Sequence, residues 1–228
     1  MQELTANLEF KNVTVRPSTH TGGLSGAEFA LRRGEIMTVM LEEGRESTPL
    51  ASLAQGLITP DSGTVFFNGE DWAQMGLHRQ AEARGRTRRV FDHYGWISNL
   101  DVLENLCLAE CHSTTRSPDD VEQEVRALAR RFGIDTIPDA RPTRVHSLTL
   151  RKLEWVRAFV GAPELIILER PCFGAPRADV GKLIEAIGEA ALRGVAVLWM
   201  AEDVSGWTST AEAEIRRFQM LGERLVAV

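Results

Sequence analysis

Short apolar runs with strand-like spacing open the chain. Apolar and polar residues alternate over residues 8–15 and 27–31, which favours half-buried strands, whereas residues 36–40 are almost continuously apolar. A continuous apolar run is typical of a strand that is buried on both faces. Residues 64–67 form a further strand-like run that ends at Asn68-Gly69, a dipeptide that accepts the positive φ angles of a type I′ turn. The amino-terminal part is therefore predicted to contain mixed strands leading into a buried sheet.

In the middle of the chain, apolar residues recur at the spacing of an α-helix. Residues 101–111 form one candidate helix, and a second begins at Ser117 as N-cap and ends at Gly133. A third is predicted over residues 149–160. The strand-like run 165–168, the helical run 179–193 and the strand-like run 195–200 then form a β-α-β unit. The pattern predicts an α/β fold.

Composition limits the number of domains and the class of partner. A chain of 228 residues with 43% apolar content fits one domain spanning residues 1–228. The net charge of −6 argues against nucleic acid as a partner, and the arginine-rich segment 79–89 is interpreted as a solvated surface. No run of 18 apolar residues and no signal-peptide layout occur, so we expect a soluble protein unless a partner holds it at a membrane. Three irregularly spaced cysteines fit a reducing cytoplasm.

Residues 34–63 have the layout of a phosphate-binding loop without its lysine. An apolar strand is followed by a loop with glycine and hydroxyl groups and then by a helix that is predicted to begin near Pro49. The three lysines of the chain lie elsewhere, at Lys11, Lys152 and Lys182. Glu42, Glu43 and Glu46 instead place negative charge where a phosphate would bind, and like charges disfavour a polyanion.

Three later stretches carry a family resemblance. VFDHYGWISNLDVLEN, VHSLTLRKLEWVRAFVGAPELIILERP and VAVLWMAED follow the phosphate-loop layout in the order and spacing of an ABC transporter ATP-binding subunit, which the chain resembles over nearly its whole length. The resemblance implies a P-loop NTPase (ABC ATPase-like) fold with a RecA-like parallel sheet core, an amino-terminal antiparallel β subdomain and a helical subdomain at about residues 93–155. The stretch WISNLDVLENLCL most resembles the ATPases of MCE-type (Mla-like) bacterial lipid transport systems.

The family binds ATP and Mg, and two of its motifs are altered here. An ungapped comparison of the phosphate loop with the family places Ser47 at the position of the family's lysine and Thr48 at the position of the hydroxyl that binds magnesium. A shift by one residue places Glu46 at the lysine position instead. Gly44 is counted with these three residues as a cofactor-binding position of the loop. The Asp-Glu pair that ends the Walker B strand is replaced by Glu169 and Arg170. Glu169 can still reach a metal, but an arginine stays protonated and cannot act as a base.

The remaining motifs also lack the residues that bind or hydrolyse ATP in the family. Asp92 replaces the glutamine of the Q-loop, Glu202 replaces the switch histidine, and Pro17 stands where an aromatic residue stacks on adenine. The signature LSGGQ aligns with residues 145–149, so that both of its glycines are lost. The signature positions considered as binding residues are His146, Ser147, Leu148 and Thr149. Because all motifs are altered together, we expect no bound cofactor and no catalytic residue in this chain.

Arginine in Walker B and glutamates in the phosphate loop suggest an internal ion pair. Arg170 is hypothesised to pair with Glu43 or Glu46 and so to close the site with the protein's own charges. The alternative is that Arg170 points to solvent.

The resemblance leads to three alternative functions. The first is a noncatalytic (pseudo-ATPase) subunit that docks on an integral membrane permease as scaffold or regulator, in lipid transport, and that forms a homodimer or a heterodimer with an active ABC ATPase. It would be cytoplasmic and peripheral at the inner membrane. Its docking residues, as the resemblance implies, are Tyr94, Trp96, Ile97, Leu100 and Leu103. The second is a weakly active ATPase that still binds ATP and Mg, and the third is a soluble ABC-like interaction module unconnected to transport.

Two weaker constellations are interpreted structurally. Cys107, Cys111 and His112 have helical spacing, but no fourth ligand is in view, so core cysteines are favoured over a metal site. His146 beside Ser147 lacks a third orienting group for nucleophilic catalysis.

Overall fold

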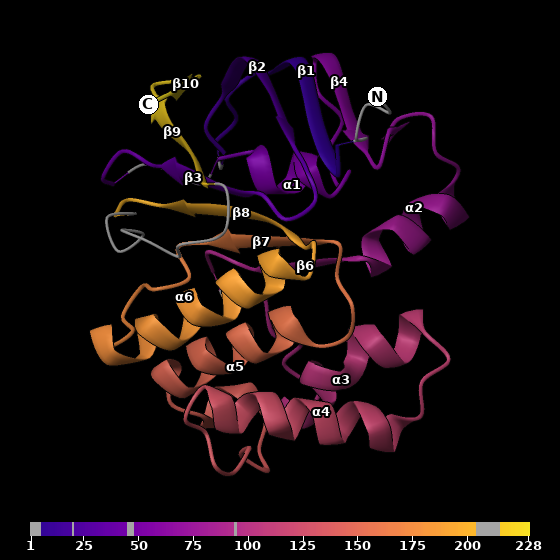
Figure 1. The fold of residues 1–228 in the computed structure, drawn as a ribbon, viewed down its shortest axis with the longest axis vertical. Helices are drawn as coiled ribbons and strands as arrows, with labels where there is room; N and C mark the ends of the chain where they lie inside the picture. Colours follow the sequence, from indigo (N-terminus) through magenta and orange to yellow (C-terminus); the bar gives the residue numbers. More distant parts are fainter. Residues whose placement is uncertain (1–5, 20, 45–47, 94, 204–214) are drawn as a thin grey trace.

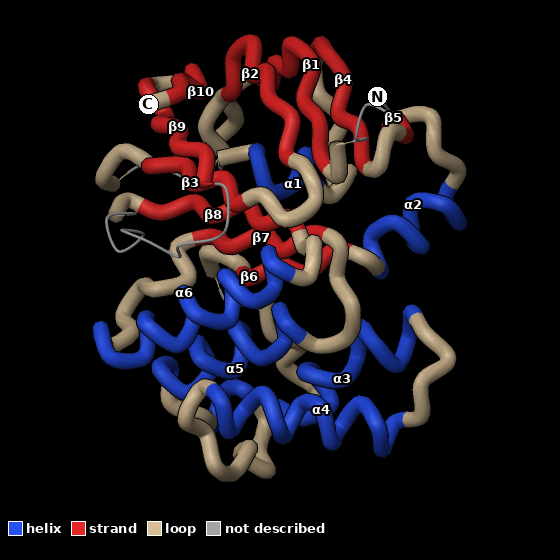
Figure 2. The backbone as a smooth tube through the Cα atoms, viewed as in Figure 1, coloured by secondary structure: helices blue, strands red, loops and turns tan. Residues whose placement is uncertain are grey.

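The protein consists of a small antiparallel sheet, a larger mixed sheet and a layer of helices, in that order (Figure 1). The computed structural model describes residues 6–19, 21–44, 48–93, 95–203 and 215–228. Figure 2 shows that the two sheets occupy one half of the molecule and most of the helices the other. This is the predicted α/β architecture with an amino-terminal antiparallel sheet.

The antiparallel sheet has the strand order β2-β1-β4-β5. Its strands are β1 (Leu8–Val15), β2 (Leu24–Leu31), β4 (Ser62–Phe67) and β5 (Glu70–Asp71). Asn68 and Gly69 join β4 to β5 with φ angles of 50° and 80°, which confirms the predicted turn. The strands predicted at 8–15, 27–31 and 64–67 are all present.

The mixed sheet has the order β10-β9-β3-β8-β7-β6. Its five parallel strands are β6 (Thr87–Val90), β7 (Leu165–Glu169), β8 (Ala196–Ala201), β3 (Ile36–Met40) and β9 (Ile215–Leu221), and β10 (Arg224–Ala227) pairs with β9 in antiparallel orientation. Along the central strands alternate side chains enter two different cores. Ile166 and Leu168 pack with the helical layer, whereas Ile167 packs with the antiparallel sheet.

Strand β6 contradicts the prediction of a solvated arginine surface over residues 79–89. Arg79 is indeed exposed on α2 (Leu77–Gly85), but Arg88 is 6% exposed and Arg89 is largely buried. Both are held by carboxylates, because Arg88 pairs with Glu110 and Arg89 with Glu169, each at 2.7 Å. A buried charge is tolerated when it is paired in this way, which composition alone does not reveal.

The predicted helices are present. They are α3 (Val102–Ser113), α4 (Pro118–Arg131), α5 (Ser147–Phe159), α6 (Arg177–Leu192) and the short α1 (Leu50–Ala54). A 3₁₀ turn that was not predicted, η1 (Pro142–Arg144), precedes α5. Ser117 caps α4 as predicted, since its Oγ accepts a hydrogen bond from the Asp120 amide. Helices α3, α4 and α5 pack on one another, and α5 and α6 share a core with the mixed sheet. No helix in the described part of the chain is long and apolar enough to span a membrane.

Candidate functional site

The altered motif positions gather at the carboxyl ends of the parallel strands. Arg170 directly follows β7, and Glu202 directly follows β8. Asp92 is the second residue after the end of β6. Because parallel strands end at the same edge of a sheet, side chains from these three strands meet there. This edge is the left side of the mixed sheet in Figure 1.

Arg170 lies between two carboxylates. Its Nη1 is 2.5 Å from Oδ2 of Asp92, and its Nε is 3.1 Å from Oε1 of Glu202. Its main chain adopts φ +40°, a left-handed conformation that is costly for a residue with a side chain, and its amide donates to the Met200 carbonyl at 2.8 Å. The arrangement joins three altered motif positions in one charge network.

This geometry contradicts the solvent-facing alternative for Arg170 and does not test a pairing with Glu46. The side chain is 12% exposed, so it does not point to solvent. Among the described residues Glu43 is exposed and forms no ion pair with Arg170, and Glu46 lies outside the described residues. Of the partners Asp92 and Glu202, Asp92 is the nearer. The sequence contained a signal for this pair, since an acidic and a cationic residue follow strands that are neighbours in the sheet.

Glu169, the remaining Walker B carboxylate, is held by an arginine. Its Oε2 accepts from Nε of Arg89 at 2.7 Å, and both side chains are nearly buried. Arg89 also donates from Nη1 to Oε1 of Gln55 at 3.3 Å and lies over the Phe91 ring at 4.6 Å. The carboxylate that the sequence left available for a metal therefore already has a cation beside it.

The phosphate loop is described only at its two ends. Gly44 adopts φ +71°, and Thr48 is buried with its Oγ1 3.4 Å from the Leu50 amide nitrogen. Glu46 and Ser47 lie outside the described residues. The helix that follows has five residues, and Pro49 is its N-cap instead of its first helical residue.

The signature segment forms the start of α5. His146 is the N-cap residue, and its Nδ1 accepts a hydrogen bond from the Leu148 amide at 3.2 Å. That nitrogen is thus engaged in capping, while Ser147 begins the helix and is exposed. Leu148 is 37% exposed, and Thr149 is half-buried.

The predicted docking residues differ in exposure. Ile97 is 43% exposed, whereas Trp96, Leu100 and Leu103 are half-buried, and Tyr94 lies outside the described residues. The Trp96 ring lies 5.0 Å from the Arg157 guanidinium, and Leu103 packs against the helical core. Ile97 is therefore the most accessible of the four described side chains.

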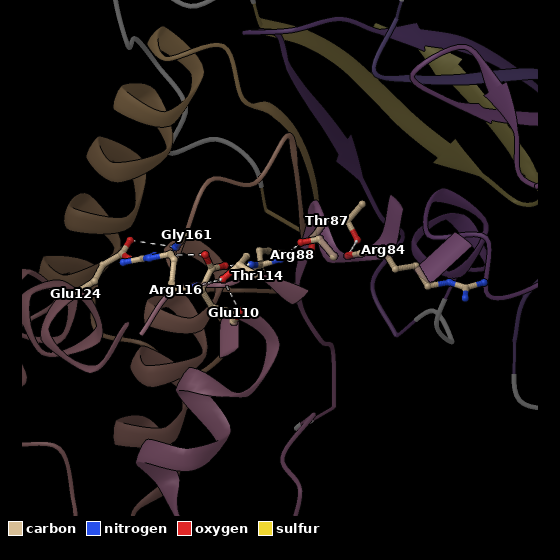
Figure 3. A network of polar contacts seen from close by, with 9 residues as sticks. Arg84, Thr87, Arg88, Glu110, Thr114, Arg116, Glu124 and Gly161 are labelled. Atoms are coloured by element: carbon tan, nitrogen blue, oxygen red, sulfur yellow. Dashed lines mark hydrogen bonds and ion pairs between the residues drawn. The ribbon is translucent and has the colours of Figure 1, made fainter. Parts of the chain in front are cut away.

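A second charge network, which the sequence analysis missed, joins β6 to the helical layer (Figure 3). Glu110 on α3 is 4% exposed and binds both Arg88, at 2.7 Å, and Arg116, at 3.3 Å. Arg116 also binds Glu124 at 2.6 Å, and Glu124 accepts a hydrogen bond from the Gly161 amide. Burial lowers the pKa of Arg88, against the opposing effect of Glu110.

The network borders a hollow of about 440 Å³ between α2 and α3. The side chains that line it belong to Arg79, Glu82, Arg86, Arg88, Glu110, Ser113, Thr114 and Ala162. Gly85 completes the lining. Acidic partners already hold its arginines, since Arg79 pairs with Glu70 and Arg86 with Glu164.

The cysteines pack as core residues. Cys107 and Cys111 are half-buried against the helical core, and His112 is exposed. Burial raises the pKa of the Cys107 thiol to about 11. In the described ranges no group of three or more His, Cys, Asp or Glu side chains is placed to hold a metal ion.

Comparison with solved structures identifies the fold. An ATP-binding subunit of an ABC transporter matches with a TM-score of 0.80 and 20% identity, covering 96% of this chain and 87% of the other. A dimeric ATP-binding cassette bound to ADP and Pi matches with a TM-score of 0.83 and 15% identity, covering 96% of each chain. At these identities the likeness concerns the fold alone.

Sequence comparison identifies relatives. A phosphonates import ATP-binding protein from Alcaligenes faecalis is 26% identical over 172 residues, which cover 72% of this chain and 62% of the relative. An uncharacterized ABC transporter ATP-binding protein from Escherichia coli K12 is 26% identical over 183 residues, covering 78% of this chain and 36% of the relative. The chain thus spans less than two thirds of either relative. The ABC transporter family model matches residues 24–172, well over half of the chain, and the chain therefore belongs to the ABC transporter family, as an ATP-binding domain.

Proposed function

We propose that this protein is a noncatalytic subunit of an ABC-type transport complex, a scaffold or regulator that docks on an integral membrane permease. The observation that carries the proposal is the position of Arg170 between Asp92 and Glu202. These residues replace the catalytic glutamate, the Q-loop glutamine and the switch histidine of the family that the chain resembles. Each is engaged with another, so none is available to position or activate a water molecule.

The residues at the strand ends do not fit ATP and Mg. Magnesium prefers carboxylate, hydroxyl and water oxygens, and Glu169 is occupied by the Arg89 guanidinium at 2.7 Å. The phosphate loop has no lysine, and the described Glu42 and Glu43 bring negative charge to it. The electrostatics of the site thus oppose a triphosphate.

The fold supports a docking role that does not need hydrolysis. The domain spans residues 1–228, and its helical subdomain, about 93–155, would contact the permease through Ile97 and the half-buried Trp96, Leu100 and Leu103. Tyr94, the fifth predicted docking residue, lies outside the described residues. The protein would then sit on the cytoplasmic side of the inner membrane, held there by its partner.

A regulatory role would follow if the protein forms a dimer with an active ATPase. A solved neighbour is a dimer, and in the family each phosphate loop faces the signature of its partner. Two copies of this chain would form no competent site. In a heterodimer with an active ATPase, residues 146–149 would face the nucleotide of the partner without the signature glycines, and we expect that site to be weakened.

Lipid is proposed as the transported class. The stretch Trp96 to Leu108 resembles the ATPases of MCE-type lipid transport systems, whereas one relative carries a phosphonate import name. Purification of the protein from native membranes, followed by identification of its partners, distinguishes these classes. Co-purification with an MCE-type permease supports lipid transport. A phosphonate permease contradicts it, and the absence of any permease favours the soluble interaction module.

An ATPase assay of the purified chain tests the missing catalysis. We expect turnover no higher than that of a buffer control under conditions in which an active ABC ATPase, assayed in parallel, hydrolyses ATP. Robust turnover that Arg170→Ala abolishes would overturn the proposal and favour the weakly active enzyme, with Thr48 and Glu169 as its metal-binding side chains.

A further inference from the structure

The segment between β6 and α3 crosses from the mixed sheet to the helical layer. Its described residues are 91–93 and 95–97, which are called the crossing segment below. Asp92 lies at its sheet end and Ile97 at its helical end. It is contacted by the sheet on one side and by the helical layer on the other.

Helix α5 holds the crossing segment through its main chain. Arg151 donates from Nη1 to the Phe91 carbonyl at 3.0 Å and from Nη2 to the Asp92 carbonyl at 3.2 Å. One turn and a half further along α5, Arg157 donates from Nη1 to the Gly95 carbonyl at 2.6 Å. Hydrogen bonds from a guanidinium are stronger than those between neutral groups.

The α5 side of this contact is buried and internally paired. Arg151 is 3% exposed and binds Glu154, which is fully buried, at 2.8 Å. A buried guanidinium that lost its carbonyl partners would carry a desolvation cost. The crossing segment and α5 should therefore move as one unit.

The helical end of the crossing segment is fixed as well. The Ile97 amide donates to Oδ1 of Asn105 at 2.8 Å, and Nδ2 of Asn105 donates to the Ile97 carbonyl at 3.0 Å. Gly95 packs so closely that a Cβ there would lie 2.3 Å from the Phe91 ring. The segment is thus folded tightly against its own first residue.

The sheet holds the same segment through a side chain. Asp92 binds Arg170 at 2.5 Å. The Arg170 amide donates a hydrogen bond to the Met200 carbonyl of β8, and the Arg170 side chain forms an ion pair with Glu202. Arg170 therefore connects the carboxyl ends of β7 and β8 to the crossing segment. Helix α5 holds the same segment through the hydrogen bonds of Arg151 and Arg157.

We propose that Arg170 is a positioning residue that locks the helical layer onto the sheet in one arrangement, without any ligand. The lock passes from Arg170 through Asp92 to the main chain of the crossing segment and then to Arg151 and Arg157. It goes beyond the proposed function, because it describes a conformational property of the free chain that holds whether or not the chain binds nucleotide. Its consequence is that the surface around Ile97 is preset for a partner.

Hydrogen exchange of the ligand-free chain, read by mass spectrometry, tests the lock. In Arg170→Gln we expect amides of the crossing segment to exchange about tenfold faster, because local opening no longer breaks an ion pair. Peptides from β1 and β2, which lie in the other sheet, should be unchanged. The matched control is Arg193→Gln, which removes an exposed arginine paired with Glu189 on α6 and should leave the crossing segment unchanged.

Further variants separate charge from backbone strain and from loss of fold. Arg170→Gly accepts the positive φ angle but lacks the cation, so it should open the crossing segment as Arg170→Gln does. If Arg170→Gln fails to fold, Asp92→Asn provides the same readout with the arginine retained. Unchanged exchange of the crossing segment in a folded Arg170→Gly or Asp92→Asn variant would overturn the proposal. A failed ATPase prediction would leave this test unaffected, since no nucleotide is present.

Discussion

Nη1 of Arg170 lies 2.5 Å from Oδ2 of Asp92, with the two side chains only 12% and 15% exposed. The two residues are 78 positions apart in the chain and meet because β6 and β7 are neighbours in parallel register. The pair places two opposite charges in contact at a nearly buried strand end. Together they form one structural unit, and the sequence analysis assigned both positions to altered family motifs.

This pairing predicts non-additive stability changes. Asp92→Asn and Arg170→Gln should each lower the free energy of unfolding by about 1–3 kcal/mol, because each removes the ion pair between these two nearly buried side chains. The double variant should lose less than the sum of the two, as is expected for residues in direct contact. Urea unfolding of the four proteins in the cycle measures the coupling. Strictly additive losses would mean that the two side chains do not stabilise each other.

The network around Glu110 predicts a larger loss. Glu110→Gln removes the charge that faces the buried Arg88, and we expect a destabilisation of about 3–5 kcal/mol. Glu122→Gln is the matched control, because Glu122 pairs with Arg126 on the exposed side of α4 and should change stability by less than about 0.5 kcal/mol. The two variants are compared by thermal and urea unfolding. Equal effects would contradict the structural role of Glu110.

Glu154 predicts a specific pH dependence. Burial raises the pKa of its carboxyl, against the opposing effect of Arg151. The folded state then binds this proton more tightly than the unfolded chain, so the contribution to stability is full below the unfolded pKa and is lost as pH rises through the folded pKa. Relative to Glu154→Gln, which cannot titrate, the wild type should lose stability as pH rises from about 4 toward neutrality. A stability difference that is constant with pH, or that changes in the opposite direction, would refute this.

Two thiols should be unreactive in the folded protein. Burial raises the pKa of Cys107 to about 11 and that of Cys172 to about 12. At pH 8 the thiolate fractions are then roughly 10⁻³ and 10⁻⁴, and only the thiolate is a strong nucleophile. Iodoacetamide labelling followed by peptide mass spectrometry should modify both far more slowly in buffer than in urea. Similar rates in the two solvents would show that these thiols are not protected as the structure requires.

Apolar periodicity was sufficient to predict most of the regular elements. The strands at 36–40 and 165–168 and the helices that begin near Ser117 and Thr149 follow from spacing and capping signals that act locally. Strand β6 was missed because two of its four residues are arginines, and their burial depends on Glu110 and Glu169, which lie far away in the chain. Strands β9 and β10 were missed as well, since β9 contains Arg216-Arg217 and its position depends on pairing with β3.

The pairing of side chains at the candidate site was not predicted from the sequence. The sequence marked Asp92, Glu169, Arg170 and Glu202 as altered motif positions, and all four lie at the carboxyl ends of the parallel strands. Which carboxylate forms an ion pair with which arginine depends on the order of the strands and on the direction of the side chains. Neither is encoded locally, so the pairs of Arg170 with Asp92 and Glu202 were not predicted, and the hypothesised pair with Glu46 lies outside the described residues.

The central claim is that this ABC-type domain does not use ATP and Mg, and a thermal shift titration tests it most directly. A ligand that binds only the native state raises the melting temperature, by an amount that grows with the ratio of free ligand to dissociation constant. The measurement is the melting temperature of the purified chain over a Mg-ATP series extending to several millimolar, with Mg-ATP addition to an active ABC ATPase as the positive control. We predict no change for this chain, whereas a saturable rise of several degrees at physiological Mg-ATP would contradict the account.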